Sequence, residues 1–392
     1  MTGQVVIVGS GHAGFQAAAS LREEGFAGGI TLVSADDGLP SQKPPLSKGF
    51  LQGKQTEESL LFRVPAWYET NAVTLRLGVR VVQIDPLGSQ LKTETGDAIP
   101  YTHLILATGA ANRPLPCPGA DDVLYLRNLA DARRIGARLE QARRVAIVGG
   151  GFIGLELAAV AAENRKTVTV VEAGSRLMER VLPPVLSGVF RRVHEQQGVQ
   201  IRLNTVAQCI EKQNESYSIQ LSDGQTVAAD LVLAGIGVIP ETNLAQAAGL
   251  VCDNGIVVNE YGQTSVSNIY AVGDCANQYN PFARRRLRLE SVQNAVDQAK
   301  TAAKHLMGEA HPYRVVPWFW THQYHLKLQM AGISAGYDQF SVAGNPETDT
   351  FSVYYYADGQ LIAVDSLNRP GDHLKARKLL EAGSCLPAHS ER

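Results

Sequence analysis

The chain has 392 residues, of which 45% are hydrophobic and 19% are charged, and its formal net charge is −2. This length allows roughly two to three domains of about 150 residues each, and the small net charge argues against nucleic acid or an anionic membrane as a partner. No uncharged apolar run approaches the ~18 residues of a transmembrane helix, and the N-terminal residues lack the basic region of a secretion signal. The five cysteines show no C-x-x-C spacing, which argues against a zinc site and favours a reducing cytoplasm.

The first predicted unit is a strand beginning at Val5, the glycine-rich turn GSGHAG at residues 9–14, and a helix of small residues. In such a G-x-G-x-x-G turn the first glycine allows the tight bend, the second admits a pyrophosphate, and the third lets helix and strand pack closely. The phosphate charge then lies at unpaired N–H groups of a helix N-terminus. The next strand ends at Asp36 and Asp37, where a carboxylate can bind a ribose or can simply be solvated.

The same pattern returns as a strand beginning at Val145 and the turn GGGFIG at residues 149–154. The strand that follows ends at Glu172, where a carboxylate can accept hydrogen bonds from both ribose hydroxyls of NAD and repels the 2′-phosphate of NADP. We therefore expect NADH rather than NADPH, although Arg176 and Arg180 lie close enough in the sequence to bind a phosphate. Two such units predict two bound dinucleotides.

Three later strand patterns lie at residues 104–110, 231–242 and 269–276. The last of them ends in Gly273 and Asp274, and a carboxylate at the end of a buried strand can bind a polyol such as the ribityl chain of FAD. The two dinucleotides can be two nicotinamides, as in a transhydrogenase, or a flavin with a nicotinamide. The second pairing is the commoner one, and these motifs favour it.

Several longer segments resemble the two-dinucleotide-binding flavoproteins of the glutathione reductase type. Within this family the chain is similar to the NADH-dependent ferredoxin reductases of oxygenase systems, the group of the putidaredoxin, rhodocoxin and biphenyl dioxygenase ferredoxin reductases. The segments that carry the resemblance are KPPLSKGFL (43–51), YLRNLADA (125–132), GGGFIGLE (149–156), AGIGVIP (234–240), AVGDCA (271–276), RLESVQNAVDQA (288–299), PWFWTHQY (317–324) and AVDSLNRP (363–370).

The resemblance implies an α/β fold with two Rossmann-type dinucleotide-binding domains and a C-terminal α+β domain. The residue pattern near the C-terminus agrees with a C-terminal domain that contains strands. Its strand-like alternation of side chains is interrupted at Asp358 and Gly359, as at the turn of a β-hairpin. The expected domains are an FAD domain of residues 1–110 and 236–314, an NADH domain of residues 111–235, and a C-terminal domain of residues 315–392.

The resemblance also implies which residues bind each cofactor, with the flavin in the first glycine turn and the nicotinamide in the second. The expected FAD residues are Gly9, Gly11, His12, Ala13, Gly14, Asp36, Lys43, Lys48, Val81, Ala107, Thr108, Gly109, Arg127, Gly273, Asp274, Glu290, Val292 and Trp320. The expected NADH residues are Gly149, Gly151, Phe152, Ile153, Gly154, Glu156, Glu172, Gly235, Ile236 and Gly237.

Three of these residues are the expected catalytic ones. The resemblance implies that Lys48 and Glu156 form an ion pair near the reactive edge of the flavin, where a lysine stabilises the electron-rich reduced ring. The alternative is two exposed charges worth less than about 1 kcal/mol. Trp320 covers the flavin, lines the electron exit, or packs in a core. We expect no metal site, because His322 and His325 lack a carboxylate or cysteine set at ligand spacing.

A ferredoxin is the expected electron acceptor. Disulfide reductases, peroxidases and NADH oxidases of this family need a reactive cysteine after the first unit, and PSQKPPLSK at residues 40–48 contains none. The electrons must then leave the protein, which indicates a 2Fe–2S ferredoxin that feeds a Rieske dioxygenase or a haem monooxygenase. Such ferredoxins are usually acidic, so a basic docking patch is expected. The candidates, which can also form a solvated charged loop, are Arg284, Arg285, Arg286, Arg288 and Lys300.

An alternative function is an NADH-sensing flavoprotein switch similar to apoptosis-inducing factor, although the long C-terminal insertion and the targeting sequence of that protein are not apparent here. The chain departs from the family pattern at two places. Ala35 stands where relatives usually carry the acid that binds the adenosine ribose, so we expect Asp36 to replace it. The chain also ends at Arg392, short of the tail of its relatives, which bears on partner contacts. A monomer and a weak dimer are both compatible with the sequence.

Overall fold

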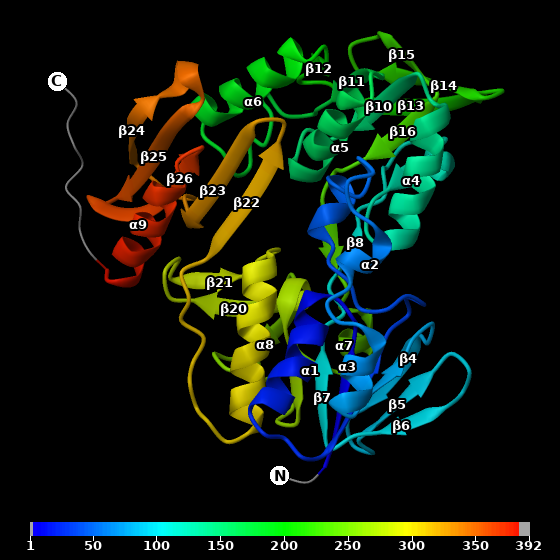
Figure 1. The fold of residues 1–392 in the computed structure, drawn as a ribbon, viewed down its shortest axis with the longest axis vertical. Coiled ribbons are helices and arrows are strands. Elements are labelled where there is room, and N and C mark those ends of the chain that lie inside the picture. Colours follow the sequence, from blue (N-terminus) through cyan, green and yellow to red (C-terminus); the bar gives the residue numbers. More distant parts are fainter. Residues whose placement is uncertain (1–2, 384–392) are drawn as a thin grey trace. The chain divides into compact units, whose positions relative to one another are not determined.

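The computed structural model describes residues 3–383, and the chain forms two compact units (Figure 1). In the described part of the chain, no helix combines the length and the apolar character that crossing a membrane requires. The C-terminal end of the chain, residues 384–392, lies outside the described residues. Unit 1 comprises Met1–Lys43, Glu58–Ala111 and Ile239–Phe319, and unit 2 comprises Pro44–Glu57, Asn112–Val238 and Trp320–Arg392.

Unit 1 is built on a five-stranded parallel sheet in the order β19-β7-β1-β2-β3. Its central strand is completely apolar after the first residue, and Val5, Val6 and Ile7 are fully buried. Helices α1 (His12–Glu23) and α8 (Val292–Leu306) lie side by side (Figure 1), and their buried alanines allow close packing. The strands are β1 (Gln4–Val8), β2 (Gly29–Val33), β3 (Val73–Arg76), β7 (His103–Leu106) and β19 (Ile269–Ala271).

Two small sheets complete unit 1, one of them antiparallel in the order β4-β5-β6 and the other in the order β18-β20-β21. Their apolar side chains form a second core with the opposite side chains of β1, such as Val6 and Val8. The elements are β4 (Val81–Asp85), β5 (Gln90–Thr93), β6 (Ala98–Pro100), β18 (Ile256–Val258), β20 (Ala276–Asn280), β21 (Arg285–Leu287), α3 (Pro65–Thr70), α7 (Asn243–Ala247) and the short 3-10 helix η3 (Gly273–Cys275).

Unit 2 repeats the arrangement with a second five-stranded parallel sheet, in the order β12-β11-β10-β16-β9. Its strands are β9 (Leu124–Tyr125), β10 (Arg144–Val148), β11 (Thr167–Val171), β12 (Gln200–Arg202) and β16 (Leu231–Ala234). The other elements of this part are α4 (Leu129–Gln141), α5 (Phe152–Glu163), α6 (Pro184–Gln196), the antiparallel strands β13 (Ala207–Gln213), β14 (Ser216–Leu221) and β15 (Thr226–Ala229), and the 3-10 helices η1 (Pro44–Ser47) and η2 (Ala120–Asp122).

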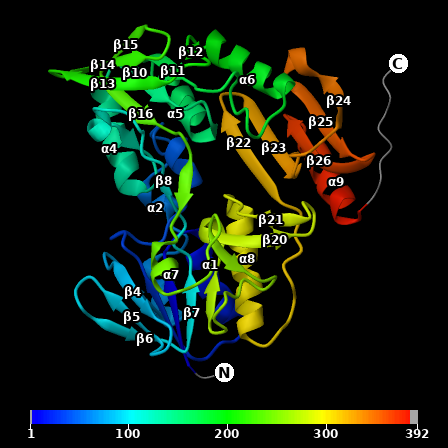
Figure 2. The same cartoon turned by 180° about the vertical axis from the view of Figure 1, so that it is seen from behind.

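The C-terminal part of unit 2 is a five-stranded antiparallel sheet in the order β22-β23-β26-β25-β24, with α9 packed against β23 and β26 (Figure 2). The hairpin expected at Asp358 and Gly359 is confirmed, because these two residues join β25 to β26 with φ angles of 50° and 71°. The elements are β22 (Trp318–Gln323), β23 (Leu326–Gly332), β24 (Gln339–Asn345), η4 (Pro346–Thr348), β25 (Thr350–Ala357), β26 (Gln360–Leu367) and α9 (Pro370–Glu381). The boundaries between the units fall in or beside α2 (Glu57–Leu60), β8 (Ala110–Asn112), β17 (Val238–Pro240) and β22.

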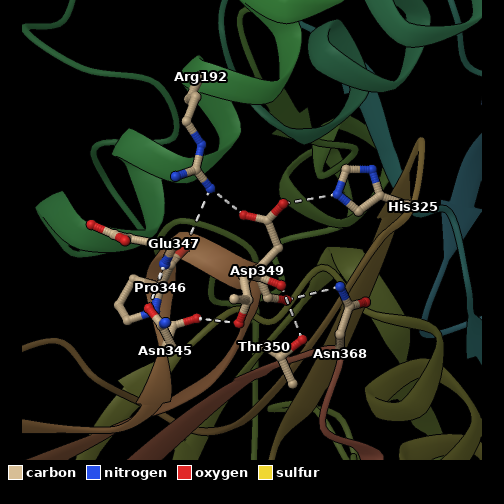
Figure 3. A network of polar contacts seen from close by, with 9 residues as sticks. Arg192, His325, Asn345, Pro346, Glu347, Asp349, Thr350 and Asn368 are labelled. Atoms are coloured by element: carbon tan, nitrogen blue, oxygen red, sulfur yellow. Dashed lines mark hydrogen bonds and ion pairs between the residues drawn. The ribbon is translucent and has the colours of Figure 1, made fainter.

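Polar contacts centred on Asp349 join the C-terminal sheet to α6 within unit 2 (Figure 3). The Asp349 carboxylate pairs with the Arg192 guanidinium of α6 and lies 2.9 Å from Nε2 of His325. Arg192 also donates to the carbonyl of Pro346 at 3.2 Å, and Asn368 Nδ2 donates to the Asp349 carbonyl at 2.9 Å. Apolar packing continues this attachment, since one core cluster contains side chains of α6, β23 and β25.

The expected fold class is confirmed, because two parallel α/β sheets each place a glycine-rich turn after their central strand. In each sheet, the helix after the glycine-rich turn connects the central strand to its neighbour on one side. The neighbour on the other side comes later in the chain and is reached by a crossover. Ligands of doubly wound sheets bind where the strand order reverses in this way. The architecture therefore supplies two binding positions, one in each unit.

Candidate functional site

The first glycine turn forms a tight backbone cradle between β1 and α1 in unit 1. Gly9 has a φ of 109°, and a Cβ added to it would lie 2.2 Å from the carbonyl oxygen of Ala107. A Cβ added to Gly14 would lie 1.8 Å from the carbonyl oxygen of Gly9. Both positions therefore exclude any side chain, since atoms at these separations would overlap.

Gly11 behaves differently from the other two motif glycines. A Cβ built on Gly11 meets no protein atom within 4 Å, so the space beside its backbone is open. Gly11 is the N-cap residue of α1, no side chain caps that helix end, and its first turn contains no acidic residue. An uncapped, positively polarised helix end beside open space fits a pyrophosphate, so the residues present fit the phosphates of FAD.

Two further elements of unit 1 pack around the start of α1. A Cβ added to Gly273 of η3 would lie 3.0 Å from the Cβ of Ala13, which shows how closely η3 approaches the helix. Helix α8 packs against η3 and starts at Val292, with the Ser291 hydroxyl accepting a hydrogen bond from Asn294 N at 3.1 Å. The strand-end residue Asp274 and the start of α8 are thus both held near the glycine turn.

Asp36 follows β2 at the same edge of the sheet. Its side chain is 43% exposed, and one oxygen lies 3.3 Å from Nζ of Lys43. The neighbouring Ser34 is buried and its hydroxyl lies 2.8 Å from the hydroxyl of Ser10 in the glycine turn. Asp36 thus lies one residue beyond Ala35 with a carboxylate accessible to a ligand, and its ribose contact stays a prediction.

His12 is the first residue of α1 and packs edge-on against Phe62, with ring centroids 4.8 Å apart. Burial, and secondarily the charge of Lys43, lowers the pKa of His12 to about 4. The ring is therefore neutral at physiological pH. This environment agrees with a packing role for His12 at the start of the helix.

The remaining expected FAD residues are divided between the units. Val81 begins β4 and is buried, residues 107–109 follow β7 directly, and Glu290 pairs with Arg288 at 2.7 Å, all within unit 1. Lys48, Arg127 and Trp320 belong to unit 2. Their contacts with a flavin held by unit 1 stay predictions.

The second glycine turn, in unit 2, reproduces the geometry of the first. Gly149 also has a φ of 109°, and Cβ atoms added to Gly149 and Gly154 would lie 2.5 Å and 2.1 Å from backbone oxygens. Gly151 caps α5 without a side-chain hydrogen bond, and the nearest atom to an added Cβ is 3.8 Å away. The residues present therefore fit a second pyrophosphate. The loop after β16 is adjacent, because a Cβ on Gly235 would lie 3.1 Å from Gly154 N.

Glu172 stands at the end of β11 and faces this turn. Its two carboxylate oxygens accept hydrogen bonds from Gly150 N at 2.5 Å and Gly174 N at 2.6 Å. A carboxylate has about four acceptor positions, so two remain for ribose hydroxyls. Arg176, in contrast, donates to the Leu182 carbonyl and to the Ser187 hydroxyl, which leaves its guanidinium engaged within unit 2.

Lys48 and Glu156 form an ion pair within unit 2, and this part of the expectation is observed directly. Nζ of Lys48 lies 2.6 Å from Oε2 of Glu156. The same oxygen accepts a short hydrogen bond from Ser47, and Oε1 accepts one from Thr321 at 2.7 Å. Glu156 is only 3% exposed, and these three contacts use most of the roughly four acceptor positions of its buried carboxylate.

The sequence alone did not identify Ser47 and Thr321 as neighbours of Glu156. It also did not identify Gln323 and His194, which continue the hydrogen bonds from Thr321. The period of a strand places alternate residues on one face, so Thr321 and Gln323 of β22 were recognisable as neighbours. Nothing in the sequence connects them to Glu156, because 165 residues separate Thr321 from that carboxylate.

The expected docking arginines lie before, on and just after β21 in unit 1. Arg284 and Arg285 are exposed. The Arg286 guanidinium donates to the carbonyls of Val258 and Asn277 at 3.0 and 3.1 Å. Arg288 is only 8% exposed and pairs with Glu290, so it lies turned inward, whereas Lys300 of α8 is half exposed.

Comparison with known proteins gives two family matches. Residues 3–299 match the pyridine nucleotide-disulphide oxidoreductase family, and residues 318–391 match the reductase C-terminal family. Rhodocoxin reductase of Rhodococcus erythropolis is 45% identical over 379 residues, which cover 96% of this chain and 89% of that protein. Putidaredoxin reductase of Pseudomonas putida is 41% identical over 384 residues, which cover 96% of this chain and 91% of that protein.

A solved structure agrees with these sequence matches. The covalent putidaredoxin reductase–putidaredoxin complex contains a chain that superimposes with a TM-score of 0.95 and 39% identity, over 98% of this chain and 94% of that one.

Proposed function

Because the chain belongs to the pyridine nucleotide-disulphide oxidoreductase family, we propose that it is an FAD-dependent NADH:ferredoxin reductase. The observation that carries this proposal is the pair of glycine cradles, together with the absence of a cysteine from residues 40–48 after the first cradle. When bound, FAD supplies the conversion of a two-electron hydride into single electrons. With no thiol relay at residues 40–48, the acceptor is a separate one-electron carrier, and the ferredoxin serves an oxygenase.

We assign the cofactors by unit. The FAD domain comprises residues 1–110 and 236–314, the NADH domain residues 111–235, and the C-terminal domain residues from 315 onward. In the FAD domain, Gly9 and Gly14 shape the turn, Gly11 lets the backbone approach the pyrophosphate, and Asp36 and Asp274 bind the polyol groups.

In the NADH domain, the second turn holds the nicotinamide dinucleotide so that its pyrophosphate meets the start of α5. Glu172 accepts the ribose hydroxyls and selects against a 2′-phosphate, and the Arg176 guanidinium is held by the Leu182 carbonyl and the Ser187 hydroxyl within the domain. NADH is therefore the preferred donor.

Lys48 and Glu156 act together beside the flavin in this proposal. The ammonium group favours negative charge that develops on the ring, and the Glu156 carboxylate orients the lysine and balances its charge. Trp320 shields the same region from water. None of the three is required to transfer a proton, since hydride passes directly between the two cofactors.

The ferredoxin docks on a basic surface of β20 and β21, which we define by Tyr279, Arg284 and Arg285. Tyr279 is 53% exposed although aromatic, and in the strand register it lies opposite Arg286. Exposed tyrosine and arginine are the residues enriched in protein interfaces. Arg286, Arg288 and Lys300 contribute positive charge to the same region, although Arg288 itself is inward-facing.

Electron delivery with two acceptors tests this function. NADH-dependent reduction of a 2Fe–2S ferredoxin is measured at low and high salt, with ferricyanide as an acceptor that needs no docking surface. Arg284→Gln with Arg285→Gln is expected to raise the ferredoxin KM several-fold at low salt and less at high salt. Ferricyanide reduction stays unchanged, and the control Arg191→Gln, which removes an exposed charge of α6, leaves both acceptors unaffected. An unchanged ferredoxin KM at low salt would exclude this docking surface.

A further inference from the structure

A buried chain of hydrogen bonds connects Glu156 to a histidine that the proposed function does not use. Thr321 Oγ1 lies 2.7 Å from Glu156 Oε1, and Gln323 Nε2 lies 3.2 Å from Thr321 Oγ1. Gln323 Oε1 then lies 2.8 Å from Nε2 of His194. The three residues come from β22 and α6 of unit 2, and all are at most 1% exposed. Such groups are costly in a core unless their hydrogen bonds are made.

The roles of donor and acceptor along this chain are determined by its chemistry. Gln323 donates through its nitrogen to Thr321, so its oxygen faces His194 and can only accept. Nε2 of His194 must therefore carry the proton. Nδ1 of His194 is then a lone pair, and it is buried without a hydrogen-bond partner.

The same logic continues to the carboxylate. Because Thr321 accepts from Gln323, its hydroxyl proton is free to point at Glu156 Oε1. The other oxygen, Oε2, accepts from Ser47 and from Lys48. Each of the three groups that bond to Glu156 is thus a donor, and each hydrogen bond in the chain from His194 is donated in the direction of Glu156. Aligned hydrogen bonds of this kind polarise one another and favour a negative charge at their end.

We propose that His194, Gln323 and Thr321 form a positioning relay that holds the Glu156 carboxylate in place and aimed at Lys48. Its catalytic consequence rests on the proposed function, whereas its geometry does not. The relay begins at His194, whose Nδ1 has no hydrogen-bond partner, and it ends at the Glu156–Lys48 ion pair. None of the three relay residues needs to touch a cofactor.

Other titratable groups face both ends of the relay. Lys48 faces Glu156 from the end of η1, and His322 of β22 is close enough to feel both charges, although burial is the main reason its pKa is lowered. The Tyr324 ring lies edge-on to His194 with centroids 5.0 Å apart. Burial also lowers the pKa of His194, which keeps its ring neutral at physiological pH.

The test uses the isosteric pair Thr321→Val and Thr321→Ser in the FAD-loaded protein. Valine keeps the shape of threonine and removes the hydroxyl, whereas serine keeps the hydroxyl. The rate of flavin reduction by NADH is measured against pH. In Thr321→Val, the rate is expected to fall several-fold and its pH profile to differ from that of the parent, because Glu156 loses the hydrogen bond that holds it against Lys48. Thr321→Ser should keep the parent profile.

A second readout does not depend on activity. Nitrogen-15 NMR of histidine-labelled protein, with His194→Asn used to assign the signal, reports which nitrogen of His194 carries the proton. The parent and Thr321→Ser should show a single tautomer protonated at Nε2. In Thr321→Val the Gln323 amide loses its anchor and can rotate, so the two tautomers should mix.

The outcomes separate the relay from the proposed function. A proton on Nδ1 in the parent protein, or the same tautomer and the same pH profile in all three proteins, would overturn the relay. If the tautomer responds to Thr321→Val but NADH reduces no flavin in the parent protein, the relay stands and the proposed function fails.

Discussion

Lys48 Nζ lies 2.6 Å from Glu156 Oε2, so the residue that follows η1 contacts a residue 108 positions later in the chain. The carboxylate is 3% exposed and the lysine 23%, so this is a largely buried ion pair. Removing one partner of such a pair leaves an uncompensated charge, which costs more than the pair itself contributes. Each residue is therefore best tested by a neutral side chain of similar shape.

We predict that Lys48→Gln slows flavin reduction by NADH about 10- to 100-fold, because the proposed function assigns this cation to the negative charge that develops on the flavin. Stopped-flow absorbance under anaerobic conditions measures this rate, and the dependence on NADH concentration should be unchanged. Glu163→Gln alters an exposed acid of the same helix as Glu156 and serves as the control. A Lys48→Gln rate equal to the parent would remove this residue from the mechanism.

The first glycine turn predicts opposite results for two neighbouring alanine substitutions. At Gly11 the added Cβ meets no protein atom, so Gly11→Ala should fold normally and lose FAD affinity by about 100-fold as the pyrophosphate is pushed away. At Gly14 the Cβ would overlap the Gly9 carbonyl, so Gly14→Ala should lower the melting temperature instead. Fluorescence titration with FAD and thermal unfolding distinguish the two. Parent-like FAD affinity in Gly11→Ala would show that the pyrophosphate of FAD does not bind beside Gly11.

Glu172 should control the choice of nicotinamide. Glu172→Ala removes the acceptor for the ribose hydroxyls and the repulsion of a 2′-phosphate, so the KM for NADH should rise about tenfold while the KM for NADPH falls. Steady-state rates with ferricyanide measure both values. Glu179→Ala, which removes an exposed acid seven residues later that bonds to Ser175, should leave the ratio unchanged. An unaltered preference in Glu172→Ala would place the selectivity elsewhere.

His12 predicts a pH dependence of stability. Its pKa is lowered from 6.5 to about 4, mainly by burial, so between these values the unfolded chain binds a proton that the folded chain does not. The contribution of the neutral His12 ring to the free energy of unfolding is therefore complete above pH 6.5 and is lost as the pH falls toward 4. Relative to His12→Phe, the parent should lose about 2 kcal/mol of unfolding free energy between pH 7 and pH 5.

Urea denaturation at the two pH values measures this difference. His311→Phe provides the control, since His311 is an exposed histidine of the same unit, and it should follow the parent. Parallel pH dependence in the parent and His12→Phe would show that His12 does not contribute.

Local sequence signals predicted the parts of the molecule that local geometry determines. Both glycine turns and the hairpin at Asp358 are marked by short sequence motifs, and Glu172 is marked by its position at the end of the strand after the second turn, and the structure contains all of them. The docking arginines show the limit of such signals. A run of positive charge does not reveal that Arg288 turns inward to Glu290, because that choice depends on the fold around it.

The relay could not be predicted for a related reason. His194 lies in a helix whose sequence gives only an amphipathic pattern, and a histidine on its apolar face reads as a packing residue. Its partner Gln323 is 129 residues away. Only the attachment of the C-terminal sheet to α6, through the core and through Arg192 and Asp349 (Figure 3), brings the two together.

The reductase function is tested by an anaerobic titration with NADH, followed by addition of an oxidised 2Fe–2S ferredoxin. In a ferredoxin reductase the visible flavin bands bleach rapidly with NADH and return as the ferredoxin is reduced. Slow bleaching into a persistent long-wavelength band that ferredoxin does not discharge would exclude this function and would favour a redox-sensing switch. Absence of flavin bands after reconstitution with FAD would show that the first glycine turn does not bind FAD.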